Sequence, residues 1–416
     1  MLISFSIQNF GPIKDKQTLS FEADKSKHLD DYYVISANGQ RLLKLGLIYG
    51  ANASGKTTIL NALDFLRTLI LYPKIQKTET FDFEPFLFDD NTPQQNTIFE
   101  IEFIQNNIRY FYEVRLNKKA IISEELYTYN PNKINIFKRN TDLDYELTAI
   151  TFGNKNNFGK LEKKSLETNT LWNNTVLGGF SKTNLEIKEL KEVTDWFNVY
   201  LMSLITSKTD IVSFFIKNKQ IDLLTQKNVI KILKQADFNI TGISKPALFN
   251  LMTIFSTPSE KIEHLEFDHN INDATYKLKY SMESQGTQKY LGLASLLYML
   301  IKNSSILMID ELESSLHPDL FVHFLLSFLT NSKQSQLIAT IHNREILNNK
   351  DIFRNDAIWI TDKNNNSCAT ELYSLADFDT KVIRDTTNIL NAYKLGKLGG
   401  IPNICDYYID IENDEK

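Results

Sequence analysis

The chain has 416 residues, of which 42% are hydrophobic and 23% are charged, as expected for a folded protein with room for two or three domains. The net charge of −5 argues against a general affinity for nucleic acid, although a local basic patch could still exist. The two cysteines, Cys368 and Cys405, lack metal-ligand spacing and argue against a zinc site or a disulfide framework.

No segment indicates export or membrane insertion. The first residues lack the basic start and long apolar run of a signal peptide. The most apolar stretch, Tyr290–Ile301, is too short to span a bilayer. We therefore expect a soluble cytoplasmic protein with no membrane partner.

The N-terminal part predicts strands around one helix. Alternating side chains over residues 1–22 predict two strands joined by a turn at Gly11-Pro12, the second over Thr18–Phe21. Leu42–Tyr49 is almost wholly apolar, which predicts a strand buried on both faces. Helical spacing of apolar residues over Thr57–Leu71 predicts the helix that follows.

The rest of the chain divides into three parts by its patterns. Residues 81–150 are strand-rich, with a hairpin of Ile98–Ile104 and Arg109–Leu116 and a further strand at Ile121–Tyr129. From about 155 to 264 helical spacing dominates, as in Leu185–Tyr200 and Ile221–Ala236. Residues 265–416 return to alternating strands and helices, with the elements Ile306–Ile309, Leu320–Thr330, Leu337–Thr340 and Ala357–Thr361. We expect an ATPase lobe at 1–154, a helical insertion at 155–264 and a second ATPase lobe at 265–416.

Residues Gly50–Thr58 fit the pattern G-x-x-x-x-G-K-[ST], with a buried strand before and a helix after. Glycines let the backbone N–H groups approach phosphate oxygens, and the helix start adds a positive dipole end. Lys56 would neutralise the β- and γ-phosphates of ATP, and Thr57 would ligate Mg²⁺. A chance match in a glycine loop is the alternative. The predicted nucleotide-binding residues of this P-loop are Gly50, Asn52, Ser54, Gly55, Lys56, Thr57 and Thr58.

Residues 305–311 end in two carboxylates after a short apolar strand, which is the pattern of a Walker B segment. Ligands bind at the carboxyl ends of strands in open α/β sheets. Asp310 would therefore hold Mg²⁺, directly or through water, and Glu311 would act as the catalytic general base. A strand end carrying two solvated acids is the alternative.

Two further motifs accompany the P-loop and the Walker B segment. Ser284, Gly286 and Thr287 precede an apolar helix and could offer a hydroxyl and N–H groups to a phosphate, although Ser284 also suits an ordinary N-cap. His342 follows the strand Leu337–Thr340 and could sense a γ-phosphate, although a lone histidine there is often structural.

Taken in this order, the motifs resemble the ABC-type ATPase heads of the SMC, RecF and OLD group. Glu313–Pro318 is similar to the D-loop of that group. The opening Ile7–Ile13, the pair Pro85-Phe86, the ESxGT form of the signature and the segment Tyr393–Pro402 are similar to stand-alone defence ATPases, in particular to the RloA/AbiL-type abortive-infection ATPases. The resemblance covers roughly residues 1–150 and 265–405.

The resemblance implies an ABC-type α/β head, with a central and mostly parallel sheet, an antiparallel β lobe and a mainly helical insertion. It also implies a homodimer or higher homo-oligomer in which two heads enclose ATP. Ser284, Gly286 and Thr287 would then act on the nucleotide of the other head, while Lys56, Glu311 and His342 would be catalytic. The signature departs from the L-S-G-G-Q of transporters, and no glutamine suits the Q-loop.

The same resemblance implies a sensor in bacterial anti-phage defence that controls a separate effector, such as a nuclease or toxin. Only about 70 residues follow His342, too few in this sequence for the C-terminal nuclease domain of OLD-type relatives. A RecF- or SMC-like DNA-repair ATPase and a non-catalytic ATP-holding scaffold are the alternatives. The cluster Lys160, Lys163 and Lys164 fits a solvated helix face or a nucleic-acid contact.

Overall fold

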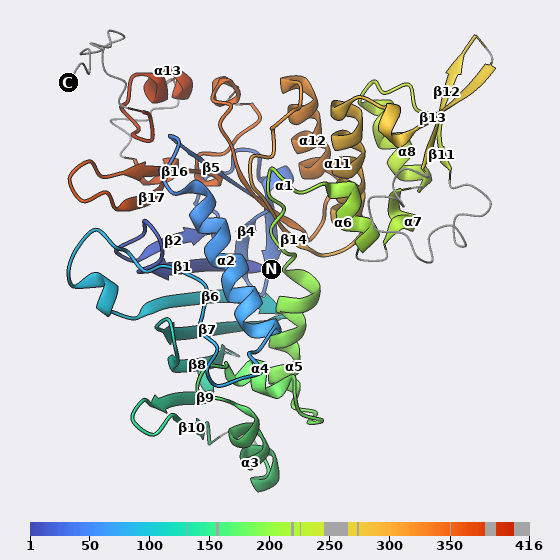
Figure 1. Ribbon diagram of the computed structural model, residues 1–416. Helices are drawn as coiled ribbons and strands as arrows, with labels where there is room; N and C mark the ends of the chain where they lie inside the picture. Colours follow the sequence, from blue (N-terminus) through green and yellow to red (C-terminus); the bar gives the residue numbers. More distant parts are fainter. Residues whose placement is uncertain are drawn as a thin grey trace, which may run out of the picture.

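The computed structural model describes residues 1–129, 131–154, 158–217, 220–224, 226–244, 265–272, 274–349, 351–378 and 388–402. Its central sheet has the strand order β14-β15-β5-β16-β17 (Figure 1). These strands are β14 (Ile306–Ile309), β15 (Gln336–Thr340), β5 (Leu45–Gly50), β16 (Ile358–Lys363) and β17 (Thr370–Ser374). The first four run parallel, and β17 pairs antiparallel with β16. Every residue of β14, β15 and β5 is buried, because both faces of a parallel sheet are covered.

A seven-stranded antiparallel sheet forms a second lobe, in the order β10-β9-β8-β7-β6-β1-β2. The strands are β1 (Leu2–Gln8), β2 (Gln17–Ser20), β6 (Thr97–Gln105), β7 (Ile108–Leu116), β8 (Ile121–Tyr129), β9 (Lys133–Asp142) and β10 (Leu147–Phe152). Burial alternates along β6 and β7, so one face packs inward and the other meets solvent. The central parallel sheet and this antiparallel lobe confirm the predicted fold class.

Helices cover the central sheet and join it to the antiparallel lobe. Helix α2 (Lys56–Leu71) contacts β5 and β15 of the central sheet and β1 of the antiparallel lobe. Helices α11 (Gln285–Lys302) and α12 (Pro318–Asn331) pack together beside β14 (Figure 1). Short elements complete this part: α1 (Asp30–Tyr33), β3 (Val34–Ala37), β4 (Gln40–Leu43), α13 (Ile389–Lys394) and the 3₁₀ turns η1 (Thr92–Gln94), η3 (Tyr280–Met282), η4 (Glu345–Asn348), η5 (Asn355–Ala357) and η6 (Leu375–Asp377).

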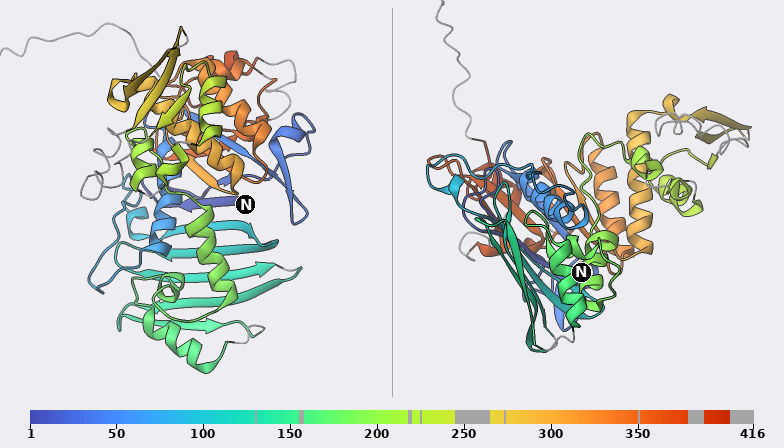
Figure 2. Two further views of the ribbon diagram at one scale, coloured as in Figure 1. Left: turned by 90° about the vertical axis from the view of Figure 1, so that its right-hand side faces the viewer. Right: turned by 60° about the horizontal axis from the view of Figure 1, so that its bottom comes forward.

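The described residues between 158 and 244 are mainly helical. They form α3 (Lys160–Asn169), α4 (Val176–Phe180), α5 (Lys188–Asp195), a π-helical turn η2 (Trp196–Tyr200), α6 (Ile211–Lys217), α7 (Ile221–Leu224) and α8 (Lys227–Gln235). Strand β11 (Gly242–Ser244) then pairs with β12 (Glu266–Ile271), which pairs with β13 (Ala274–Lys279). Helix α8 and these strands form an arm that projects from the sheets (Figure 2). The predicted insertion limits at 155 and 264 lie outside the described residues.

Two sequence predictions need correction. The predicted strand Leu42–Tyr49 is two strands, β4 and β5, interrupted at Lys44. Lys44 is buried and its ammonium donates to the carbonyls of Leu329 and Ser332, so the chain changes partner sheet at this residue. The predicted helix Ile221–Ala236 is two helices, α7 and α8. No helix in the described ranges is long and apolar enough for a bilayer crossing.

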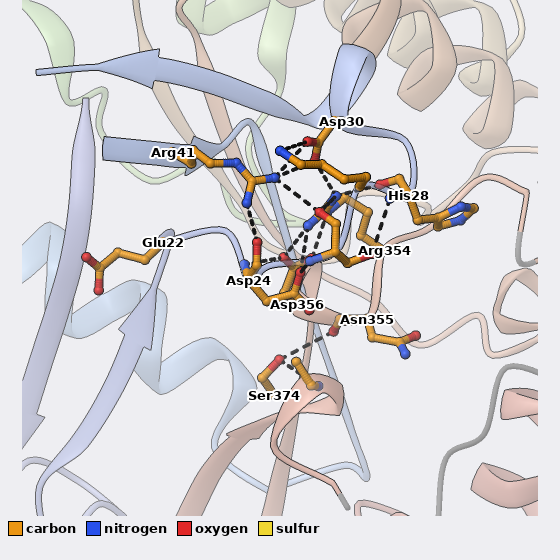
Figure 3. Close-up of polar contacts among 12 residues, drawn as sticks. Glu22, Asp24, His28, Asp30, Arg41, Arg354, Asn355, Asp356 and Ser374 are labelled. Carbon is orange, nitrogen blue, oxygen red and sulfur yellow. Dashed lines mark hydrogen bonds and ion pairs between the residues drawn. The ribbon is translucent and has the colours of Figure 1, made fainter. Parts of the chain in front are cut away.

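A buried arginine ties the N-terminal segment to the C-terminal half (Figure 3). Arg354 is 1% exposed and forms ion pairs with Asp24, Asp30 and Asp356 at 2.7 to 2.9 Å. Its guanidinium also donates to the backbone carbonyl of His28. It donates to the Ser26 carbonyl as well, at 3.3 Å, so three carboxylates and two carbonyls compensate the desolvation of one buried cation.

Candidate functional site

The carboxyl ends of four parallel strands meet at one edge of the central sheet. β5 ends at Gly50, β14 leads into Asp310, β15 ends at Thr340 and β16 passes Thr361. The register places Thr361 beside Gly50 and Thr340 beside Ile48. The P-loop, the two acids and the segment that leads to His342 thus lie at the edge where open α/β sheets bind ligands.

The P-loop has the backbone of a phosphate cradle. Ala53 and Gly55 have φ values of 61° and 99°, and α2 begins at the next residue, Lys56. Lys56 as a residue is 5% exposed, and its ammonium donates to the carbonyls of Gly50 and Ala51 at 2.8 and 2.9 Å. Burial lowers the pKa of Lys56, and the nearby carboxylates of Asp310 and Glu311 oppose that shift.

The structure brings together Thr57 and Asp310, the two residues predicted to hold Mg²⁺. The Thr57 hydroxyl donates to the Asp310 carboxylate at 3.0 Å. Thr340, fully buried, donates to the same carboxylate at 2.6 Å and accepts the backbone N–H of Glu311 at 2.8 Å. Thr340 therefore orients both Walker B acids, a role that its position before His342 did not suggest.

His342 lies beside Glu311, with its Nε2 3.4 Å from Glu311 Oε1. Both side chains are about two-fifths exposed, so a ligand can reach them. Glu313 holds the backbone here: its Oε1 accepts the N–H of His342 and, at 3.1 Å, the N–H of Asn343. A carboxylate two residues after Glu311 thus positions the loop that carries His342.

The predicted signature residues form the N-terminus of α11. Ser284 is the N-cap, and its hydroxyl accepts the N–H of Thr287 at 3.1 Å. Ser284 is exposed, Gly286 is half-buried and Thr287 is buried. The hydrogen bonds that the described chain gives to these side chains stay within the first turn of α11 and none reaches the P-loop. The structure therefore does not join the signature to the P-loop of the same chain.

A cavity of about 400 Å³ separates the start of α11 from the Walker B acids, and its lining includes Gln285, Asp310 and Glu311. Residues 206–210 line the same cavity. Leu201 and Ile205 form parallel bridges to Ile306 and Ile309, which extends the central sheet beyond β14.

Thr206 therefore emerges beside Asp310, at the same edge of the sheet. The sequence analysis did not single out Thr206, because the two bridges that place it carry no local motif. The Lys289 ammonium on α11 donates to the carbonyl of Ser314. It therefore links the signature helix to the turn after Glu311.

The remaining predicted P-loop residues differ in accessibility. Asn52 is exposed at the tip of the loop. Thr58 is half-buried, and a Cβ at Gly11 would lie 3.4 Å from its Cγ2. Ser54 is 2% exposed, and its hydroxyl bonds Thr361 at 2.6 Å, so it faces β16 rather than the open side of the loop.

A family model described as "AAA domain, putative AbiEii toxin, Type IV TA system" matches residues 47–348, well over half of the chain. The chain belongs to this AAA family. The matched span contains the P-loop, Asp310, Glu311 and His342. Membership confirms the predicted P-loop ATPase group.

The AAA domain is also similar to solved structures. One is the SMC head domain from Thermotoga maritima, at 13% identity and a TM-score of 0.45, covering 90% of this chain and 98% of that one. Another is an SMC head bound to the C-winged helix domain of ScpA, at 14% identity and a TM-score of 0.45, covering 90% of this chain and 97% of that one. A third is an Smc head with an extended coiled coil bound to the C-terminal domain of ScpA, derived from Pyrococcus furiosus. Its identity is 13% and its TM-score 0.43, covering 95% of this chain and 98% of that one. No curated protein matches the chain.

Oxygen atoms at the tip of β14 fit a hard divalent cation. Thr57 Oγ1 and the Asp310 carboxylate approach each other at the start of α2, and Mg²⁺ prefers such oxygen ligands. Asp310 is 7% exposed, so a cation there would lie largely out of bulk water. Thr57 and Asp310 are the residues that would hold Mg²⁺.

Proposed function

We propose that this AAA domain binds ATP with Mg²⁺ and hydrolyses it to ADP and phosphate at the carboxyl edge of its central sheet. The observation that carries the proposal is the 3.0 Å contact between the Thr57 hydroxyl and the Asp310 carboxylate, directly after Lys56. A phosphate-binding loop, a cation site and an activating acid are the parts that phosphoryl transfer to water requires.

The P-loop would bind the phosphates through its backbone N–H groups and the start of α2. Lys56 would leave the carbonyls of Gly50 and Ala51, which it now contacts, and turn its ammonium to the β- and γ-phosphates. Thr57 and Asp310 would hold the cation between them. Mg²⁺, when bound, supplies positive charge that neutralises the phosphate oxygens.

Glu311 would accept a proton from the attacking water. Its backbone is fixed by the Thr340 hydroxyl, and its carboxylate faces His342. His342 would donate a hydrogen bond to the γ-phosphate and so report its presence. Because His342 and Glu311 are 3.4 Å apart, one ligand can contact both groups.

We further propose that the site is completed by a second copy of the chain. Ser284 is exposed, and the start of α11 makes no hydrogen bond to its own P-loop in the described residues. A symmetric pair would let each α11 N-terminus cap the nucleotide of the other chain. ATP would thus drive assembly of a homodimer or higher homo-oligomer, and hydrolysis would release it.

The biological role that we propose is a cytoplasmic sensor of RloA/AbiL-like, abortive-infection type, in which this switch controls a separate nuclease or toxin. The family description, which names an AbiEii toxin and a Type IV TA system, supports a place in such a system. The projecting arm of α8 and β11–β13 leads through η3 directly into Ser284. A partner on the arm could therefore respond to nucleotide at the signature.

ATP turnover by the Glu311→Gln protein tests the catalytic assignment. We expect ATP binding to be retained and turnover to fall by about 100-fold or more, the usual effect of losing a general base. Lys56→Ala should instead weaken ATP binding by about 10-fold or more, because a charge-assisted contact is lost. Equal turnover by Glu311→Gln and wild type would contradict the role of Glu311. Unchanged binding by Lys56→Ala would contradict the P-loop assignment.

Capture from the native host tests the biological role. Tagged Glu311→Gln protein, held with ATP, should retain a nuclease-like or toxin-like protein, and wild type in ADP should release it. Recovery of DNA with repair factors, and no such protein, would instead favour a RecF- or SMC-like repair ATPase.

A further inference from the structure

Two threonines of the β16–β17 hairpin contact the P-loop on the side that faces the central sheet. The Thr361 hydroxyl bonds the Ser54 hydroxyl at 2.6 Å and donates to the Tyr49 carbonyl at 3.2 Å. The Thr370 hydroxyl donates to the Ser54 carbonyl at 2.9 Å. Thr361, Thr370 and Ser54 are each at most 2% exposed. The hairpin therefore contacts the loop through buried hydroxyls, and both contacts end on one residue, Ser54.

The two P-loop glycines fit against these same threonines. A Cβ at Gly50 would lie 2.3 Å from Thr361 Oγ1, and a Cβ at Gly55 would lie 2.5 Å from Thr370 Oγ1. Real Cβ atoms do not approach other atoms so closely, so the threonines occupy the space that side chains at 50 and 55 would need. The glycines of the motif thus allow close packing on the hairpin side as well as close approach to phosphate.

A glycine turn at Gly399-Gly400 packs against the hairpin at Thr361. Gly399 and Gly400 have φ values of 66° and 65°, and a Cβ at Gly400 would meet the Thr361 carbonyl at 3.2 Å and the Gly50 Cα at 3.4 Å. Tyr393 donates to the Gly400 carbonyl at 2.7 Å, which anchors this turn to α13. Thr361 is therefore packed between the P-loop and a glycine turn, and it cannot move away without disturbing both.

We propose that Thr361 and Thr370 are positioning residues of the nucleotide site, which hold the P-loop backbone in its phosphate-accepting shape through Ser54. The inference rests on the proposed function, because it assumes that the loop binds nucleotide. A loop ordered before binding loses less conformational freedom when the phosphates arrive. The two hydroxyls thus raise nucleotide affinity without touching the nucleotide.

The test is MgADP binding by isothermal titration to the full chain, with Thr361→Val and Thr370→Val as the main variants. Each change keeps the side-chain shape and removes one hydroxyl, so we expect the Kd to rise about five-fold, the typical effect of one lost hydrogen bond. Thr361→Ser, which keeps the hydroxyl, should restore most of the affinity. Thr170→Val is the matched control, because Thr170 is also buried, at 4% exposed, and its hydroxyl donates to the Leu166 carbonyl at 2.7 Å, far along the chain from the P-loop.

Turnover separates positioning from general damage. The KM for ATP should rise with the Kd, while kcat at saturating ATP stays within about two-fold of wild type, because only binding depends on the loop shape. Ser54→Ala removes the same Ser54–Thr361 contact from the loop side and keeps the proposal testable if Thr361→Val does not fold. The double variant Ser54→Ala with Thr361→Val should have a Kd for MgADP within about two-fold of the weaker single variant, because both changes remove the same contact.

The failure of this inference is distinguishable from failure of the proposed function. If wild type does not bind MgADP, or Lys56→Ala binds as well as wild type, the nucleotide site itself is wrong. If wild type binds and Lys56→Ala does not, but Thr361→Val and Thr370→Val both bind like wild type, the positioning role is overturned. An equal loss of affinity in Thr170→Val would also overturn it.

Discussion

Removing the Glu313 carboxylate should disconnect His342 from the Walker B turn. Glu313 Oε1 accepts the N–H groups of both His342 and Asn343. A hydrogen bond to a charged group contributes about 1.5–3 kcal/mol. If Glu313→Ala removes one such contribution to the alignment of His342 in the transition state, kcat should fall about 10- to 160-fold. ATP affinity should change little, because the P-loop contacts are untouched.

The assay is steady-state ATP hydrolysis at saturating MgATP, paired with nucleotide binding by titration. Glu313→Gln is the matched control, since its amide oxygen can still accept both N–H groups and should preserve most of the turnover. The double variant Glu313→Ala with His342→Ala should be no slower than His342→Ala alone, because the two changes break one unit. Wild-type turnover in Glu313→Ala, or effects that multiply with His342→Ala, would refute the reasoning.

Three further predictions concern the scaffold and the residues that orient the site. Arg354→Met should lower the free energy of unfolding by about 3–5 kcal/mol, because it leaves the buried carboxylate of Asp356 without its cation, and a loss below about 1 kcal/mol in denaturant titration would contradict the network. Burial raises the pKa of Glu124 from 4.5 to about 7, so between those pH values the folded state binds a proton that the unfolded state has released. The free energy of unfolding should therefore fall as the pH rises from 4.5 to about 7. Glu124→Gln should flatten this pH dependence, and an unchanged slope would argue against the role of Glu124. Thr340→Val should reduce turnover about 10-fold at saturating MgATP, since the Asp310 carboxylate and the backbone N–H of Glu311 both lose their contact with the Thr340 hydroxyl, and normal turnover would exclude that role.

Much of the fold was predictable from local patterns. The strand–loop–helix unit at Gly50–Thr58 follows from glycine placement and apolar spacing, and the short strand before Asp310 follows from its apolar run. Both depend on neighbouring residues alone, so one sequence is enough to find them. The break at Lys44 was not predictable, because its partners Leu329 and Ser332 lie 285 and 288 residues away.

The same difference applies to the site. Lys56, Thr57 and Asp310 belong to short motifs, and the structure brings the last two together. Thr361 and Thr370 belong to no motif, and contact the P-loop only because β16 pairs beside β5. Residues that shape a site from a distant strand carry no local signal, so they become visible only when the strand order is known.

Hydrolysis between two copies of the chain is tested most directly by mixing two inactive variants. Lys56→Ala lacks a working P-loop, and Gly286→Asp places a carboxylate where the signature would meet phosphate. The nearest atom to a Cβ at Gly286 would be 3.8 Å away, so the fold should tolerate the Gly286→Asp substitution. Each variant alone should be inactive. An equimolar mixture should recover about a quarter of wild-type turnover, because half of the dimers are mixed and each mixed dimer keeps one intact site. Absence of recovery, with wild type active and dimers exchanging, would contradict the composite site.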